Sequence, residues 1–323
     1  MRKRDADWKP SEEQKKLWPE LSGNAVNGLG EEAPRQPTMV FWHSPHDAPI
    51  AHLPVQRFFY AQPQPPEVAE ARKVRQQAIE LPLSPIAPAR VERTPQEWSA
   101  ELKRRALKLG ADAVGIARMR PEWVFQGHEV KQKWIVVLGI AMDYETFKDA
   151  PDPKAAAEIH VQYGRGIRTA RLLANSLRED GVDALGTGGP MSGDFTMIPP
   201  ALAAGLGELG KHGSIINRKL GACFRLSCVL TDVELVADTP DNFGADDFCS
   251  LCRLCVDACP PDAIFNEKQR VRGETRWYVD FDKCVPYFVE HLGCGICIAE
   301  CPWSRPGVAG NLLVKMAARR AQP

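Results

Sequence analysis

The C-terminal third of the chain contains the stretch Cys249-Ser-Leu-Cys252-Arg-Leu-Cys255-Val-Asp-Ala-Cys259-Pro260. A second run of cysteines follows it and reads Cys284-x9-Cys294-x2-Cys297-x3-Cys301-Pro302. The first spacing is that of bacterial two-cluster ferredoxins, in which the fourth cysteine of a run binds the other cluster. Steps of two residues let the chain wrap one cubane, and the step to Cys-Pro turns it toward a second. These two runs therefore decide how the C-terminal part of the chain folds.

The spacings predict two [4Fe–4S] clusters whose ligands are crossed between the runs. One cluster is expected to take Cys249, Cys252, Cys255 and Cys301. The other is expected to take Cys259, Cys284, Cys294 and Cys297. Zinc sites and disulfide frameworks are the alternatives, but zinc sites usually come as separated cysteine pairs. Cys284 departs most from the ferredoxin pattern, because nine residues separate it from the next ligand.

Charge and cysteine usage narrow the class of protein. Lys+Arg and Asp+Glu both number 41 in 323 residues, so no global charge favours nucleic acid or an anionic membrane. Eight of the ten cysteines lie in cluster spacing, which favours a reducing compartment. Arg2-Lys3-Arg4 has no apolar segment after it, and no apolar run is long enough to span a bilayer. We expect a cytoplasmic protein without a leader or a membrane span, with Cys223 and Cys228 as core thiols.

Composition divides the chain into four expected segments. These are an N-terminal arm over 1–93, an α/β domain over 94–240, a two-cluster domain over 241–310 and a tail over 311–323. The arm is dense in proline and looks irregular. Its aromatic groups at 39–42 and 58–60 suit a segment that lies across the body and covers part of a pocket. A partly disordered tail is the alternative.

Local signals place helices and strands in the middle segment. Thr94-Pro95-Gln96-Glu97 is a capping box that predicts a helix to about 109, and strands are expected at 113–117 and 134–141. Asp152-Pro153 begins the next helix, for which we expect a break near Tyr163-Gly164. Strands at 214–217 and 224–233 are expected to form a hairpin. This alternation predicts an α/β or α+β layer structure without a dinucleotide-binding Gly-x-Gly-x-x-Gly motif.

Small residues dominate the block at 203–214. Four glycines there would let the backbone approach a large flat ligand closely. The alternative is a tight packing corner between a helix and a strand. About 240 residues precede the clusters, so we expect the clusters to supply electrons to something bound in the middle segment.

Three further stretches carry a family resemblance together with the cluster runs. They are Ala-Gly-Leu-Gly-Glu-Leu-Gly-Lys-His-Gly at 204–213, Gly-Ala-Cys-Phe-Arg at 221–225 and Leu-Thr-Asp-Val-Glu-Leu at 230–235. Together with Cys301-Pro302-Trp303-Ser304 they resemble reductive dehalogenase catalytic subunits, over roughly 95–310. Epoxyqueuosine reductases share a looser version.

The resemblance implies an α+β fold, with a nitroreductase-like cobalamin-binding domain followed by a ferredoxin-like domain with two [4Fe–4S] clusters. The corrinoid is expected to be base-off, because the Asp-x-His-x-x-Gly signature of an imidazole ligand is absent. Protein contacts to the corrinoid are expected from Gly205, Leu206, Gly207, Glu208, Lys211, His212, Gly213 and Ser214, and from Ser192 in the preceding loop.

The resemblance also implies two catalytic residues. Tyr163 stands where reductive dehalogenases place a proton-donating tyrosine, and Arg225 stands where they place an arginine or lysine beside it. A phenol with a pKa near 10 needs a nearby cation to release its proton. The alternatives are that Tyr163 is a core tyrosine and that Arg225 pairs with Asp232 or Glu234. His160 is expected to be structural.

Reductive removal of halide from an organohalide is the function that the resemblance implies. Electrons are expected to come from an external ferredoxin or flavin reductase, and to pass from the Cys284 set to the Cys249 set and on to cobalt. Two alternatives stay open: corrinoid reduction of a tRNA nucleoside, as in epoxyqueuosine reductases, and a non-catalytic electron-transfer or corrinoid-binding protein. The sequence identifies neither the substrate nor the oligomeric state.

Overall fold

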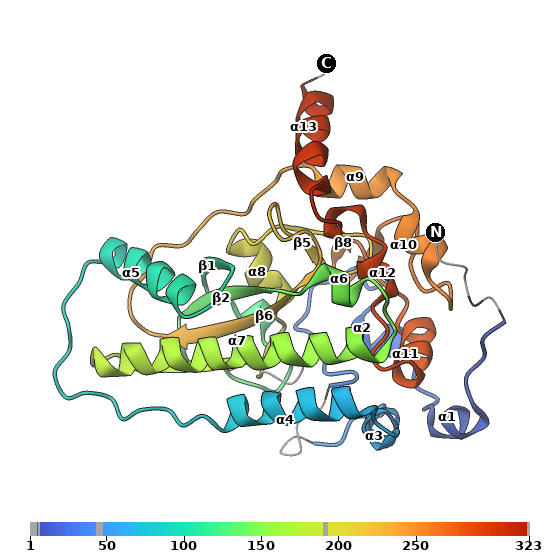
Figure 1. Ribbon diagram of the computed structural model, residues 1–323, viewed down its shortest axis with the longest axis horizontal. Helices are drawn as coiled ribbons and strands as arrows, with labels where there is room; N and C mark the ends of the chain where they lie inside the picture. Colours follow the sequence, from blue (N-terminus) through green and yellow to red (C-terminus); the bar gives the residue numbers. More distant parts are fainter. Residues whose placement is uncertain (1–4, 6, 43–47, 190–192, 322–323) are drawn as a thin grey trace.

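An antiparallel sheet of four strands forms the centre of the molecule (Figure 1). The computed structural model describes residues 5, 7–42, 48–189 and 193–321. The strand order is β1-β2-β6-β3. The strands are β1 (Ala113–Arg118), β2 (Trp134–Ala141), β3 (Ala184–Gly188) and β6 (Phe224–Thr231). Both central strands are buried on both faces because alternate side chains enter two separate apolar cores.

Helices cover the two faces of this sheet. On one face α5 (Pro95–Lys108) and α7 (Pro153–Glu179) pack against Val136, Leu138 and Ile140. On the other face α8 (Ile198–Ala203) lies against Ile135 and Val137. The mixture of an antiparallel sheet with helices confirms the α+β class. Thr94 caps α5 with the capping box predicted from its sequence.

Two local expectations were wrong. Helix α7 continues through Tyr163-Gly164 without a break. A Cβ on Gly164 would lie 3.2 Å from the Cα of Arg75, so this glycine allows α4 to pack closely on α7. The strand predicted at 214–217 does not form a hairpin with β6. Ile215–Ile216 (β5) pairs instead with Glu208–Leu209 (β4), because β6 uses both of its edges for β2 and β3.

The N-terminal segment was expected to be irregular, but it contains four helices. They are α1 (Glu12–Leu17), α2 (Gly23–Asn27), α3 (Leu53–Ala61) and α4 (Pro66–Glu80). Proline was counted as a helix breaker, yet α3 and α4 carry it in the first turn, where a missing N–H costs little. Figure 1 shows α4 running alongside α7. This part of the N-terminal segment therefore packs against the body of the molecule.

The C-terminal segment carries both cysteine runs. Its larger helices are α9 (Ala245–Leu251), α10 (Leu254–Ala258), α11 (Phe281–Glu290), α12 (Ile296–Ala299) and α13 (Val308–Arg320). Strands β7 (Gln269–Val271) and β8 (Glu274–Arg276) form a hairpin between the runs. The remaining short elements are η1 (Pro121–Trp123), α6 (Tyr144–Phe147) and η2 (Pro302–Ser304). The expected tail is thus mostly α13.

A search of the described residues finds no helix with the length and apolar character needed to cross a bilayer.

Candidate functional site

The eight cysteines gather in two neighbouring groups. Cys301 interacts electrostatically with Cys249, Cys252 and Cys255, although the first run ends far from it in sequence. In the other group, Cys284 interacts with Cys294 and Cys259. Cys297 interacts with Cys294, Cys284 and Cys259, and also with Cys255 of the first group, so it lies between the two groups. The grouping agrees with the crossed ligand sets predicted from the spacing.

Burial keeps these thiols protonated in the absence of a cation. It raises the pKa of Cys249 to about 11 and that of Cys255 to about 12. The same cause raises the pKa of Cys294 to about 11. A bound positive charge such as iron would favour the thiolates here, so cluster assembly would release protons.

The thiol spacing suits cubanes better than single ions. Among the residues that the structure describes, no three His, Cys, Asp or Glu side chains converge closely enough to hold one metal ion. A mononuclear zinc site needs four donors around one point. A cubane instead spreads its thiolates over four irons. Backbone N–H groups of Lys211 and Ala263 donate to the sulfurs of Cys249 and Cys259, each at 3.4 Å, and such bonds tune cluster potentials.

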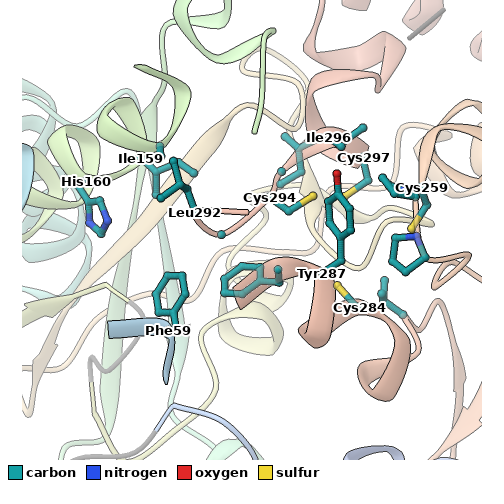
Figure 2. A pocket seen from close by; sticks show the side chains of 18 of the residues that line it. Phe59, Ile159, His160, Cys259, Cys284, Tyr287, Leu292, Cys294, Ile296 and Cys297 are labelled. Atoms are coloured by element: carbon teal, nitrogen blue, oxygen red, sulfur yellow. The ribbon is translucent and has the colours of Figure 1, made fainter. Parts of the chain in front are cut away.

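A cavity of ≈ 200 Å³ lies between helix α7 and the Cys284 group. Including its open mouth, the hollow measures ≈ 1040 Å³. On the side opposite the cysteines, the cavity is lined by the polar side chains of Arg75, His160, Tyr163 and Arg225. Figure 2 shows the sulfur-bearing residues on one side of the cavity and His160 with Phe59 on the other. We call this hollow the α7 cavity; its thiol side is formed by Cys259, Cys284, Cys294 and Cys297.

The two predicted catalytic residues meet at the α7 cavity. Tyr163 extends from α7 and Arg225 from β6, and the guanidinium carbon of Arg225 lies 5.5 Å from the centre of the Tyr163 ring. A cation over the ring face is attracted by the ring quadrupole. The alternative pairing of Arg225 with Asp232 is not seen, because Asp232 accepts from the backbone N–H of Lys133. No salt bridge joins Arg225 to another described residue. Its Nε atom is buried without a partner.

The cysteines that line the cavity are not those expected nearest to the corrinoid. The cysteines beside Tyr163 are those of the Cys284 group, and none of Cys249, Cys252, Cys255 and Cys301 lines the cavity. The expected electron path placed the Cys249 set next to the corrinoid. Cys284 lies on α11, whose aromatic face packs against the N-terminal segment that closes the cavity. The order of the two clusters along the electron path stays a prediction.

The glycine-rich block is a packing corner. None of its eight predicted corrinoid contacts (Gly205, Leu206, Gly207, Glu208, Lys211, His212, Gly213 and Ser214) lines the α7 cavity. A Cβ on Gly205 would lie 2.5 Å from the carbonyl oxygen of Thr239, and one on Gly207 would lie 2.0 Å from that of Ile216. Leu206 is in the apolar core, and Gly213 packs on Val279. The close contacts at Gly205 and Gly207 are those of a tight packing corner, and corrinoid contacts by this block stay a prediction.

Polar residues of the block support the Cys249 group. The Glu208 carboxylate accepts from four consecutive backbone N–H groups at the start of α9, the helix that carries Cys249. Lys211 is 2% exposed, and its Nζ donates to the carbonyl oxygen of Cys252 at 3.0 Å. His212 is buried, and its Nδ1 accepts from the N–H of Ser214. Ser192 lies outside the described residues.

Sequence reasoning missed the contribution of α3 and α4 to the cavity. Tyr60 and Arg75 line it together with Trp42 and Phe59. Trp42 and Phe59 were expected in the wall, whereas Phe41 and Phe58, expected with them, pack into the cluster next to α11. Arg75 carries no sequence signal of its own, because it lies on an otherwise charged helix.

The other two cysteines are core thiols, as predicted. Burial raises the pKa of both Cys223 and Cys228 to about 12. Cys223 lies in the apolar cluster that also holds Cys249 and Cys301, Cys228 lies in the core on the other face of the sheet, and neither lines the α7 cavity.

Comparisons with known proteins show what the chain is similar to. Residues 248–304 match the family model described as a 4Fe-4S dicluster domain. Tetrachloroethene reductive dehalogenase of Desulfitobacterium hafniense is 32% identical over 211 residues, covering 61% of this chain and 37% of that protein. The enzyme of the same name from Sulfurospirillum multivorans is 28% identical and covers 66% of this chain and 52% of its own length.

Solved structures of reductive dehalogenases are also similar to this chain. The catabolic reductive dehalogenase NpRdhA in complex with 3-bromo-4-hydroxybenzoic acid is 27% identical, with a TM-score of 0.73 over 84% of this chain and 42% of that one. The chain is therefore similar to reductive dehalogenases in sequence and in fold. A second structure, whose description concerns B12-dependent dehalogenation, is 28% identical with a TM-score of 0.71 over 79% of this chain and 39% of that one.

The similarity to reductive dehalogenases is wider than that to epoxyqueuosine reductases. The epoxyqueuosine reductase of Leadbetterella byssophila is 36% identical, but over 121 residues and 32% of this chain. The chain spans about half or less of the length of the curated reductive dehalogenases it matches.

Proposed function

We propose that this protein is a corrinoid-dependent and iron–sulfur-dependent reductive dehalogenase in which Tyr163 donates the proton that replaces the halide. The observation that carries the proposal is the α7 cavity, where Tyr163 and Arg225 face the Cys284 group across one hollow. A catalytic tyrosine next to an electron source is the arrangement that reductive replacement of a halide by hydrogen requires.

The residues around the cavity fit a base-off corrinoid. Its walls are mostly apolar, with Ala156 and Ile159 on α7 facing Leu292 and Ile296, which suits a large flat macrocycle. His160, the histidine in the lining, has both ring nitrogens in contact with arginines. It therefore presents no free imidazole as a metal ligand. When bound, the corrinoid would supply the low-potential cobalt that activates the carbon–halogen bond.

The protein's own residues would donate the proton and stabilise the charge that its transfer leaves. Tyr163 holds the proton at its hydroxyl, and Arg225 stabilises the negative charge that develops on the phenol when the proton leaves. The apolar wall excludes water, which strengthens this interaction. Electrons would enter through the Cys249 group, leave through the Cys284 group, and come from an external ferredoxin or flavin reductase.

Replacement of Tyr163 tests the proposal. The Tyr163→Phe variant, reconstituted anaerobically with cobalamin, should keep its iron and its corrinoid spectrum but lose at least about 100-fold in halide release, the usual worth of a positioned acid. Tyr144→Phe is the matched control, because its hydroxyl donates to the carbonyl oxygen of Ala299 outside the cavity. Full halide release by Tyr163→Phe would remove the proton-donor role, and absence of corrinoid binding by the wild type would remove the function.

A further inference from the structure

Lys211 is a buried cation beside the Cys249 group. Of the lysines and arginines in the described part of the chain, it alone is buried, with 2% of its surface exposed. Its Nζ atom donates to the carbonyl oxygen of Cys252 at 3.0 Å, and its backbone N–H donates to the sulfur of Cys249 at 3.4 Å. Both ends of this residue therefore contact the first cysteine run.

No carboxylate neutralises the Lys211 ammonium. The salt bridges between described residues do not include it, and its other neighbour is the ring of Trp277, whose centre lies 5.0 Å from Nζ. A buried charge without a counter-charge costs free energy, because water no longer solvates it. An iron–sulfur cluster held by four thiolates is anionic and would supply the missing counter-charge.

The charges near the Cys249 group give the direction of the effect on a cluster there. Burial is the largest cause that raises the pKa of Cys249 and of Cys255, and the positive charge of Lys211 lowers the pKa of both thiols. Asp246 acts against Lys211 at Cys249. However, Asp246 is partly exposed and forms a salt bridge with Lys268 at 2.6 Å, so its charge is screened. The uncompensated charge beside these thiols is therefore that of Lys211.

The Cys284 group lies in a different electrostatic environment. Besides burial, which is the largest cause, the pKa of Cys284 is raised by charges on Cys294, Cys259 and Asp280, all of them negative when ionised. The one lysine that the described fold buries lies beside the other group. The two clusters would thus be surrounded by different charges, and a nearby charge changes the free energy of adding an electron.

We propose that the Lys211 ammonium raises the reduction potential of the Cys249 cluster above that of the Cys284 cluster. Reduction adds one electron from a low-potential donor and breaks no bond, so the cluster gains one negative charge that a fixed cation in a buried site stabilises. An electron that enters the pair therefore settles on the Cys249 cluster. The inference goes beyond the proposed function, because it needs the two clusters of the dicluster domain and no particular substrate.

An anaerobic redox titration followed by EPR spectroscopy measures both midpoint potentials on the iron-loaded full chain, without turnover. Lys211→Met keeps the side-chain length and removes the charge. At a fixed potential, the ratio of reduced to oxidised Cys249 cluster should fall about 10- to 30-fold, and each tenfold change equals about 59 mV for one electron. The other midpoint should stay unchanged. Lys268→Gln is the matched control, because Lys268 lies over the same Trp277 ring but is partly exposed and paired with Asp246.

Unchanged midpoints in Lys211→Met would overturn the proposal. A fall of the same size in Lys268→Gln would also overturn it, because a general loss of positive charge would then explain the shift. If Lys211→Met does not retain its iron, the wild type decides. Cys252→Ser alters one ligand and so identifies the EPR signal of the Cys249 cluster, and a wild-type midpoint of that signal at or below the other would contradict the proposal.

These outcomes are independent of the proposed function. Halide release by a protein whose midpoints do not depend on Lys211 would keep the dehalogenase and remove this inference. A midpoint that depends on Lys211, in a protein that binds no corrinoid, would keep this inference and remove the dehalogenase.

Discussion

Replacement of Glu208 by glutamine should loosen helix α9 and with it the Cys249 cluster. The Oε1 atom of Glu208 accepts from the N–H groups of Phe243, Gly244 and Ala245 at 2.5, 2.7 and 3.1 Å, and Oε2 accepts from Asp246 at 3.0 Å. These donors are the free N–H groups of the helix start, where a carboxylate is favoured by the helix dipole. The carboxylate therefore clamps the helix that carries Cys249.

The magnitude follows from what glutamine can still accept. If its oxygen takes the Oε1 position, three bonds survive without charge assistance, each weaker by roughly 1 kcal/mol. The amide NH2 then faces the N–H of Asp246, which leaves a donor unsatisfied at a cost of about 1–3 kcal/mol. Bonds to one group are not additive, so we expect a loss of about 3 kcal/mol in the local stability of α9. That raises the population of the opened helix about 100-fold.

Iron release measures this opening. Under anaerobic conditions with an excess of Fe(II) chelator, Glu208→Gln should lose half of its iron about 100-fold faster than the wild type, while the Cys284 cluster keeps its iron. Glu234→Gln is the control, because Glu234 is exposed. Unchanged iron release together with weakened corrinoid binding would refute the capping role and support the corrinoid contact expected from the sequence.

Two further substitutions test the packing corner and the buried histidine. Gly207→Ala places a Cβ 2.0 Å from the carbonyl oxygen of Ile216 and should lower the free energy of unfolding by about 2 kcal/mol or more. Gly30 is also at positive φ but has open space around it, so Gly30→Ala should lower the free energy of unfolding by about 1 kcal/mol. Equal losses for the two variants would contradict the close-contact argument. Folding lowers the pKa of His160 from an ordinary 6.5 to about 3. The imidazole therefore takes up a proton more readily in the unfolded state, and the free energy of unfolding falls as the pH drops below 6.5. Between pH 6.5 and 5 the wild type should lose up to about 1.4 kcal/mol per pH unit more than His160→Gln in anaerobic urea unfolding, and parallel pH profiles would show that His160 is not held neutral.

The cysteine spacing determined the two cluster groups because ligand spacing is a local property of the chain. Steps of two and three residues fix which thiols reach one cubane, and the structure brings together the sets that the spacing predicts. The capping box at Thr94 and the strand at 134–141 were predictable for the same reason, since caps and strand periodicity depend on near neighbours. The encounter of Tyr163 with Arg225 followed from the family resemblance alone.

Tertiary structure decided what lies against each of these elements. Which cluster borders the cavity depends on how α11 packs against the N-terminal helices, and the glycine block became a tight corner because the backbone at 216 and 239 lies against it. Arg75 reaches His160 only because Gly164 lets α4 approach α7. These are contacts between residues far apart in the chain, which no local pattern encodes because side-chain volume and backbone approach determine them.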